Sequence, residues 1–133
     1  MVFPMRIWRI DVARFGAALA VALVLVGGAG CDRSSSEPDA KAKAVARDAV
    51  PSDPALAAVY ERSCRTCHSH EEAKAPLTGF APHWSGRLSQ GMPTLLAHVR
   101  DGFNGMPARG YCNDCTDATY EALIRFMSAN NNP

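Results

Sequence analysis

The sequence predicts a small all-α domain built from three main helices and the loops between them. Apolar residues recur at helical spacing in three separate segments, and no run of alternating apolar and polar residues competes with them. The chain has 133 residues, 47% of them apolar, but the uncharged stretch of residues 15–30 holds a large share of that total. The folded part is therefore smaller than the full length suggests, and its own core would be marginal.

The first predicted helix begins at Pro54 and reaches Cys67. Asp53 can cap its start, and proline suits the first helical turn because the backbone N–H of that position needs no partner within the helix. Residues 75–90 are rich in proline and glycine. We expect a loop there, with one short helical turn near Trp84.

The second and third predicted helices follow this loop. The second covers about residues 93–101 and ends at Gly102, a residue type that often terminates helices. The third begins at Thr116 or Asp117. Its predicted buried stripe consists of Tyr120, Leu123, Ile124 and Met127.

Residues 1–30 have the organisation of an export signal peptide. Three arginines precede the uncharged stretch, and small residues follow it up to Cys31. A retained membrane anchor is the alternative interpretation, but the stretch is shorter than the roughly 20 apolar residues of a spanning helix. Export would place the rest of the chain in an oxidising compartment.

Cys31 lies directly after this segment, at the position where a bacterial lipoprotein carries its lipidated first mature residue. Lipid chains on Cys31 would tether the protein to a membrane in the bacterial periplasm. A free Cys31, or one that is trimmed away, is the alternative. Lipidation would also account for the odd cysteine, because the other four form two Cys-x-x-Cys pairs.

Residues 32–50 are expected to form a flexible linker, and residues 51–133 the folded domain. The linker segment has no aromatic residue, and its four positive charges balance four negative ones. Of the 14 Lys and Arg and 13 Asp and Glu residues, three Arg and one Asp lie in the leader, which leaves eleven against twelve. So small a net charge argues against binding DNA or RNA by bulk electrostatics.

The sequence Cys64-Arg65-Thr66-Cys67-His68 is a Cys-x-x-Cys-His motif, the attachment sequence of c-type haem. Two thiols three positions apart can each form a thioether with one haem, and the histidine that follows can reach the iron. A redox-active dithiol is the alternative, but such dithiols are ordinarily accompanied by βαβ units, which this sequence lacks.

Further short motifs follow along the domain. They are Ala75-Pro76, Trp84-x-x-Arg87-Leu88, Gln90-Gly91-Met92-x-Thr94-Leu95, Gly102-Phe103-Asn104-Gly105-Met106-Pro107-x-x-Gly110 and Cys112-x-Asp114-Cys115. With the attachment motif, they make the chain resemble a class I c-type cytochrome of the cytochrome c5 group. The resemblance covers nearly all of residues 54–127. It implies a small class I cytochrome c fold, with three main helices and loops around one covalently bound haem c.

The resemblance also implies roles for individual residues. Cys64 and Cys67 hold the haem, and His68 and Met106 are the axial ligands of its iron. The carbonyl of Pro76 accepts a hydrogen bond from the His68 ring and so fixes the ring orientation. The resemblance further implies a disulfide in the second cysteine pair, formed by Cys112 and Cys115.

The residue types also favour Met106 as a ligand, because it lies between a glycine and a proline and a thioether is a soft ligand for iron. The other methionine side chains are expected to be packing residues, and the other histidines are expected to lie at the surface or to form hydrogen bonds. These are Met92, Met127, His70, His83 and His98. Trp84 and Arg87 match family positions near the haem propionates, with a core position as the alternative for Trp84.

These features predict an electron carrier and not an enzyme. Thr116, and not histidine, follows the second cysteine pair, so we expect one haem. The protein would carry single electrons between membrane-associated respiratory redox complexes, alone or as the electron-transfer module of a larger oxidoreductase. The sequence indicates no oligomeric state.

Two other functions use the same residues. A displaceable Met106 would make the haem a binding or sensing site for a small ligand. The four paired cysteines could instead hold zinc. The distance between the two pairs exceeds common zinc-ribbon loops, however, and His68 would then have no role.

Overall fold

The computed structural model of the protein describes residues 37–129. The predicted export signal, Cys31 and residues 32–36 lie outside the described residues, as do residues 130–133. Cleavage of the leader and lipidation of Cys31 therefore stay predictions.

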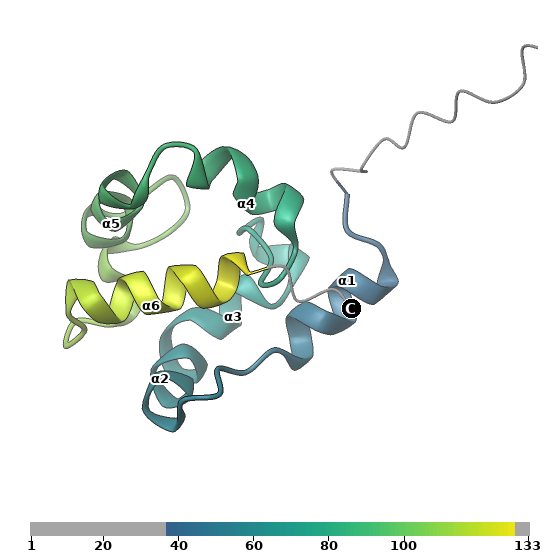
Figure 1. The fold of residues 1–133 in the computed structure, drawn as a ribbon, viewed down its shortest axis with the longest axis horizontal. Helices are drawn as coiled ribbons and strands as arrows, with labels where there is room; N and C mark the ends of the chain where they lie inside the picture. The colour runs from purple at the N-terminus through teal and green to yellow at the C-terminus, as the bar shows by residue number, and fades with distance from the viewer. Residues whose placement is uncertain (1–36, 130–133) are drawn as a thin grey trace, which may run out of the picture. The chain divides into compact units, whose positions relative to one another are not determined.

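The described part of the chain is all-α, as the sequence predicts (Figure 1). Its α-helices are α1 (Ala40–Asp48), α2 (Pro54–Val59), α3 (Arg65–His68), α4 (Ala81–Leu88), α5 (Met92–Asp101) and α6 (Asp117–Ser128). A π-helical turn, η2 (Tyr60–Cys64), and two 3-10 turns, η3 (Glu71–Ala73) and η4 (Ala108–Tyr111), complete the described elements. Strand-like pairing within residues 37–129 is limited to one bridge between Phe103 and Met106.

The first predicted helix consists of three consecutive segments, α2, η2 and α3. Asp53 caps its start, where the carboxylate accepts a hydrogen bond from the backbone N–H of Leu56 at 2.7 Å. Within η2 the helix widens, and the N–H of Arg65 donates to the carbonyl of Tyr60. Such π-helical turns are rare and occur frequently at functional sites. This π-helical turn ends at Cys64, the first cysteine of the attachment motif.

The later helices match the predicted segments, but α4 is longer than the single turn expected near Trp84. It covers eight residues, with Pro82 in its first turn. The helix α5 ends at Gly102, and α6 is capped by Thr116, whose hydroxyl accepts a hydrogen bond from the N–H of Thr119 at 3.3 Å. The loop-rich stretch therefore contains a complete two-turn helix.

The core lies where α6 packs against α2 and α5 (Figure 1). Buried side chains from η2, α4, α5 and α6 meet there: Tyr60, Trp84, Leu95, Leu123, Ile124 and Met127. The predicted stripe of α6 is confirmed, because all four of its residues are buried. Burying one large apolar side chain contributes about 1.5–3 kcal/mol.

The predicted flexible linker contains a docked helix, α1, so that prediction was wrong for residues 40–48. Asp39 caps the helix through the N–H of Ala42 at 2.8 Å. Ala42 and Ala46 are buried and pack against Leu77 and Phe80. Alanine carries too little apolar surface for such a face to stand out in the sequence, but its small size allows the helix to approach its partners closely.

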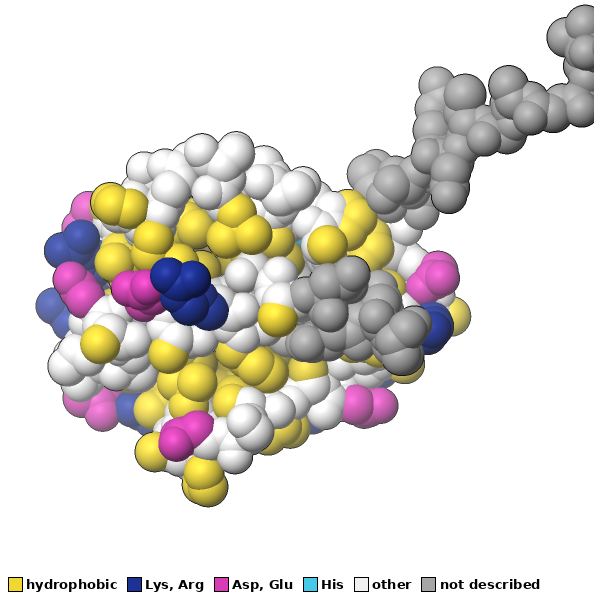
Figure 2. All heavy atoms as spheres, in the orientation of Figure 1, with side chains coloured by type: hydrophobic (Ala, Val, Ile, Leu, Met, Phe, Trp, Pro, Cys, Tyr) yellow, Lys and Arg dark blue, Asp and Glu magenta, His cyan; other side chains and the backbone are white. Residues whose placement is uncertain are grey.

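Charged side chains of both signs are scattered over the face in Figure 2, around a band of apolar side chains. No single sign of charge dominates this face, in agreement with the balanced composition of 14 basic and 13 acidic residues. Among the described residues, no helix has the length and apolar character needed to cross a membrane.

The position of Leu123 at the centre of the core gives a first prediction. Leu123 is 2% exposed, so Leu123→Ala should lower the free energy of unfolding by about 2–5 kcal/mol, because it removes buried methyl groups and leaves a cavity. Leu88, which is 41% exposed, is the matched control. Leu88→Ala should change the free energy of unfolding by less than about 0.5 kcal/mol. Urea unfolding curves of the two variants check this. Equal losses would contradict the assigned core.

Candidate functional site

The reactive side chains of the attachment motif lie at the end of the first helix. Cys64 ends η2, and Cys67 and His68 belong to α3. Cys64 lies three positions before Cys67 and four before His68, a spacing that brings side chains of successive helical turns near each other. Both thiols are half-buried, and neither forms a disulfide. Burial raises the pKa of Cys64 to about 11, so this thiol stays protonated at neutral pH.

His68 is held in one orientation and one protonation state. The residue is 7% exposed, and Nδ1 of its ring lies 2.8 Å from the carbonyl oxygen of Pro76. Because a carbonyl only accepts hydrogen bonds, Nδ1 carries the proton and Nε2 keeps its lone pair. Burial lowers the pKa of His68, which favours the neutral ring that can bind a metal.

Residues 75–80, here called the proximal loop, are tied to the helices around them. The backbone N–H of Thr78 donates to the carbonyl of His68 at 2.8 Å. The hydroxyl groups of Thr78 and Tyr60 lie 3.0 Å apart in a buried hydrogen bond, and the N–H of Gly79 donates to the carbonyl of Met127. The loop that carries Pro76 is thus fixed to η2, α3 and α6.

Helix α4 holds the same loop through Leu77. The N–H of Leu77 donates to Nδ1 of His83 at 3.1 Å, and its carbonyl accepts from the indole N–H of Trp84 at 2.7 Å. The Trp84 ring also stacks on His68, with 5.9 Å between ring centroids. Its N–H is therefore not available to a haem propionate, and Trp84 has the core position that was the alternative interpretation. This contact agrees with the surface or hydrogen-bonding role expected for His83, although the sequence did not indicate Leu77 as its partner.

Met106 lies in a tight loop that is shaped by glycines. Phe103 and Met106 exchange two backbone hydrogen bonds, at 3.1 and 3.0 Å. A Cβ atom on Gly110 would lie 3.2 Å from the methyl carbon of Met106, and one on Gly102 would lie 3.0 Å from its carbonyl oxygen. Both glycines also have positive φ angles. Other residue types would therefore be disfavoured at these positions by the backbone conformation as well as by the close contacts.

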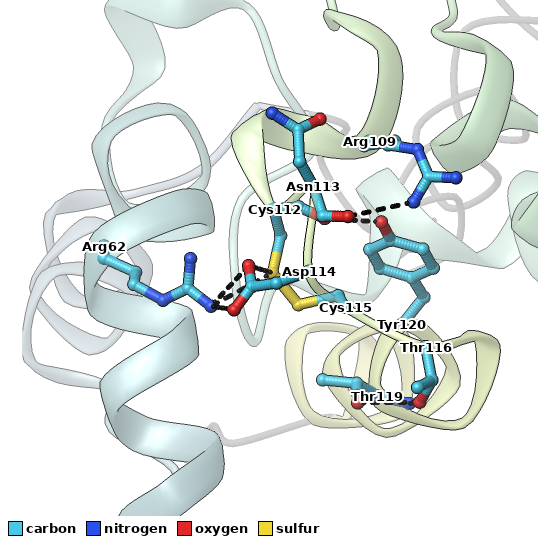
Figure 3. The surroundings of a disulfide bond; sticks show 9 residues. All are labelled: Arg62, Arg109, Cys112, Asn113, Asp114, Cys115, Thr116, Thr119 and Tyr120. Atoms are coloured by element: carbon cyan, nitrogen blue, oxygen red, sulfur yellow. Dashed lines mark hydrogen bonds and ion pairs between the residues drawn. A yellow bond between two sulfur atoms is a disulfide. The ribbon is translucent and has the colours of Figure 1, made fainter.

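A disulfide joins Cys112 and Cys115 directly after this loop (Figure 3). Arg62 lies in η2, within the helix formed by α2, η2 and α3, here called the attachment helix. It binds both carboxylate oxygens of Asp114, at 2.9 and 2.8 Å, and reaches Sγ of Cys112 at 3.4 Å. The hydroxyl of Tyr120, from α6, donates to the carbonyl of Cys112 at 2.7 Å. The disulfide loop is thereby connected to the attachment helix and to the last helix. Sequence reasoning missed Arg62, because a single arginine on a helix carries no signal of its partner.

The other methionine and histidine side chains have different partners. Met127 belongs to the core, and Met92 packs against it. His83 accepts the hydrogen bond described above, and His98 stacks on a phenylalanine ring with centroids 3.9 Å apart. His70 is exposed.

The residues of this site fit a covalently attached haem. Two free thiols lie within four positions of a buried imidazole whose Nε2 lone pair is available, and a glycine-shaped loop holds a thioether. These are the groups that c-type haem with a histidine and methionine ligand pair requires. A four-thiolate zinc site does not fit, because Cys112 and Cys115 are joined in a disulfide.

Comparisons with known proteins agree with this chemistry. A family model described as "Cytochrome C oxidase, cbb3-type, subunit III" matches residues 51–127. Cytochrome c-555 of Chlorobaculum tepidum is 36% identical over 74 residues, which are 53% of this chain and 68% of that protein. Cytochrome c5 of Azotobacter vinelandii is 36% identical over 72 residues, which are 53% of this chain and 87% of that protein.

The fold also matches a solved structure. A chain in the crystal structure of an electron transfer complex of nitrite reductase with cytochrome c superposes with a TM-score of 0.51 and 37% sequence identity. The match covers 57% of this chain and 93% of the other. The residues of α1 precede the segment that the family model matches.

The contact between Gly110 and Met106 gives a second prediction. Gly110 has a φ of +54°, so Gly110→Ala should cost about 1–2 kcal/mol of stability and displace the Met106 methyl group. In haem-loaded protein the weak red absorption band of thioether-ligated ferric iron should decrease. Gly105→Ala is the control, because a Cβ there meets no atom within 4 Å and needs no positive φ. Equal behaviour of the two variants would refute the assigned role of Gly110.

The Arg62–Asp114 ion pair gives a third prediction, on pH. The Arg62 guanidinium holds the pKa of Asp114 below its ordinary value of 3.8. A lowered folded-state pKa contributes stability above the unfolded pKa, and this contribution is lost as the pH falls through the folded value. The thermal midpoint of Asp114→Asn should thus lie slightly below that of the wild type at neutral pH, and the two should converge in acid. A gap that stays constant down to the lowest pH would contradict the ion pair.

Proposed function

Because this chain belongs to the cytochrome c family, among the small class I c-type cytochromes, we propose that it carries single electrons on one haem c. Cys64 and Cys67 form the thioether bonds, and His68 and Met106 bind the iron. The observation that carries this assignment is the buried His68 ring, whose Nδ1 proton is held by the Pro76 carbonyl and whose Nε2 is thereby left to bind a metal.

The haem supplies the redox chemistry when bound, since its iron can hold or release one electron. The chain contributes the environment. The hydrogen bond to Pro76 keeps the His68 ring in one orientation and raises its basicity as a ligand. The loop around Met106 supplies a soft sulfur ligand, which favours the ferrous state, and the disulfide loop restricts its movement. If His68 and Met106 both held the iron, no position on it would be left for a substrate, and no catalytic residue would be needed.

The proposed site of action is the bacterial periplasm. A leader of residues 1–30 would direct export, a lipidated Cys31 would attach the protein to a membrane, and residues 51–133 would form the cytochrome domain. The partners proposed are membrane-bound respiratory complexes that donate and accept electrons. Two comparisons support redox partners of this general kind, namely the oxidase subunit in the description of the family model and the nitrite reductase bound to the similar cytochrome.

A sensing function is the second candidate, and the glycine-shaped loop is the feature that would allow it. If Met106 left the iron, a small ligand could bind in its place. The tight backbone pairing of the loop and its disulfide argue against easy displacement. We therefore favour electron transfer.

Replacement of Met106 separates these functions. Met106→Leu in haem-loaded protein should abolish the thioether band of the ferric form and allow the ferrous form to bind carbon monoxide. Met92→Leu, which alters a methionine packed against the core, should leave both properties unchanged. Absorption spectra under argon and carbon monoxide check this. Carbon monoxide binding to the unaltered protein at similar concentrations would favour the sensing function instead.

A further inference from the structure

The helix α1 precedes the segment matched by the cytochrome family model, yet it is fixed to the surroundings of His68 by several different contacts. Nη2 of Arg65, which lies inside the attachment motif, donates to the carbonyl of Arg47 at 2.7 Å. Lys43 and Glu71 form an ion pair at 2.7 Å. Arg65 and Glu71 are each three residues from His68 in the sequence, so both polar contacts reach α1 from segments that flank this histidine.

The apolar contact of α1 is made with the proximal loop. Ala46 is fully buried and Ala42 is 4% exposed, and the cluster that they form contains Leu77 and Phe80. Leu77 is also completely buried. The exposed charges of the ion pair contribute little stability on their own, so this alanine face is the main reason for docking.

Leu77 connects this contact to the iron ligand through one peptide group. The carbonyl of Pro76 and the N–H of Leu77 belong to the same planar peptide, and every described peptide bond is trans. The carbonyl accepts the hydrogen bond of His68, and the N–H donates to His83 at 3.1 Å. A displacement of Leu77 therefore rotates or shifts the carbonyl that orients the His68 ring.

From these contacts we infer that α1 is a positioning element for the proximal iron ligand. By covering Leu77 and binding Arg65, it holds the proximal loop in the position that gives His68 a strong hydrogen bond to Pro76. The inference rests on the proposed role of His68 as an axial ligand. The segment between the leader and the cytochrome domain is then part of the redox centre's support, in addition to any role as a tether.

The physical consequence is a shift of the reduction potential. A strong hydrogen bond from Nδ1 makes the imidazole a more basic ligand, which stabilises the ferric state. When α1 detaches, this bond weakens and the ferrous state becomes relatively more favourable. We expect about a threefold rise in the ratio of ferrous to ferric protein at a fixed applied potential, which is about 28 mV at 59 mV per tenfold change for one electron.

The test compares two substitutions in one helix, in the full haem-loaded chain. Ala46→Gln places a long polar side chain in a fully buried position, and Ala40→Gln places the same side chain at an exposed position of α1. Neither changes the net charge. Tryptic cleavage after Lys43 and Arg47 measures detachment of α1, and a potentiometric titration measures the potential.

We expect trypsin to cleave Ala46→Gln about tenfold faster than the wild type, and this variant to show the higher reduction potential. Ala40→Gln should match the wild type in both the cleavage rate and the reduction potential. Faster cleavage with an unchanged potential would overturn the inference, and so would equally rapid cleavage of the wild type. Should Ala46→Gln not accumulate, Ala46→Gly weakens the same contact more gently and must shift both readouts in the same direction. A wild-type protein without covalent haem would instead refute the proposed function, a failure that a pyridine haemochrome spectrum identifies separately.

Discussion

The peptide group between Pro76 and Leu77 is the point on which the site depends. Its carbonyl fixes the His68 ring and selects the tautomer with a free Nε2, while its N–H is bound by His83. Because a peptide is planar, these two hydrogen bonds together determine how the imidazole lies. Trp84 binds the carbonyl of Leu77, and α1 packs against the cluster that contains Leu77. Much of the packing beyond the central core thus serves to keep one carbonyl in place.

The Met106 loop is held by a separate set of contacts that leads back to the same helix. Residues of η4 lie against α5 and η2, and Arg62 of η2 binds Asp114 within the disulfide loop. The helix that holds His68 is therefore linked to both loops. A redox centre benefits from this arrangement, because little movement on a change of oxidation state means little reorganisation during electron transfer. The small ring closed by the disulfide limits its entropic contribution to stability, so its value lies mainly in local rigidity.

The sequence was sufficient for the fold class, the three main helices and the residues proposed to bind haem. Periodic apolar stripes, helix caps and the Cys-x-x-Cys-His motif are local patterns, and they can be recognised without knowing what lies opposite. The contacts that the sequence did not indicate join residues in different elements, 52 positions apart for Arg62 and Asp114 but only six for Leu77 and His83. Nothing in the sequence marks Arg62 as the partner of Asp114, or Leu77 as the partner of His83. These pairs become apparent only in the folded structure. The helix α1 was missed for a related reason, since an alanine face becomes apolar burial only when Leu77 and Phe80 cover it.

A potentiometric titration of the full chain, combined with a haem-to-protein ratio, tests the central claim most directly. A carrier with one histidine- and methionine-ligated haem should contain one covalent haem per chain and titrate reversibly as a single one-electron step at a positive potential. A second haem, a step that involves two electrons, or a chain that folds without covalent haem would each contradict the account.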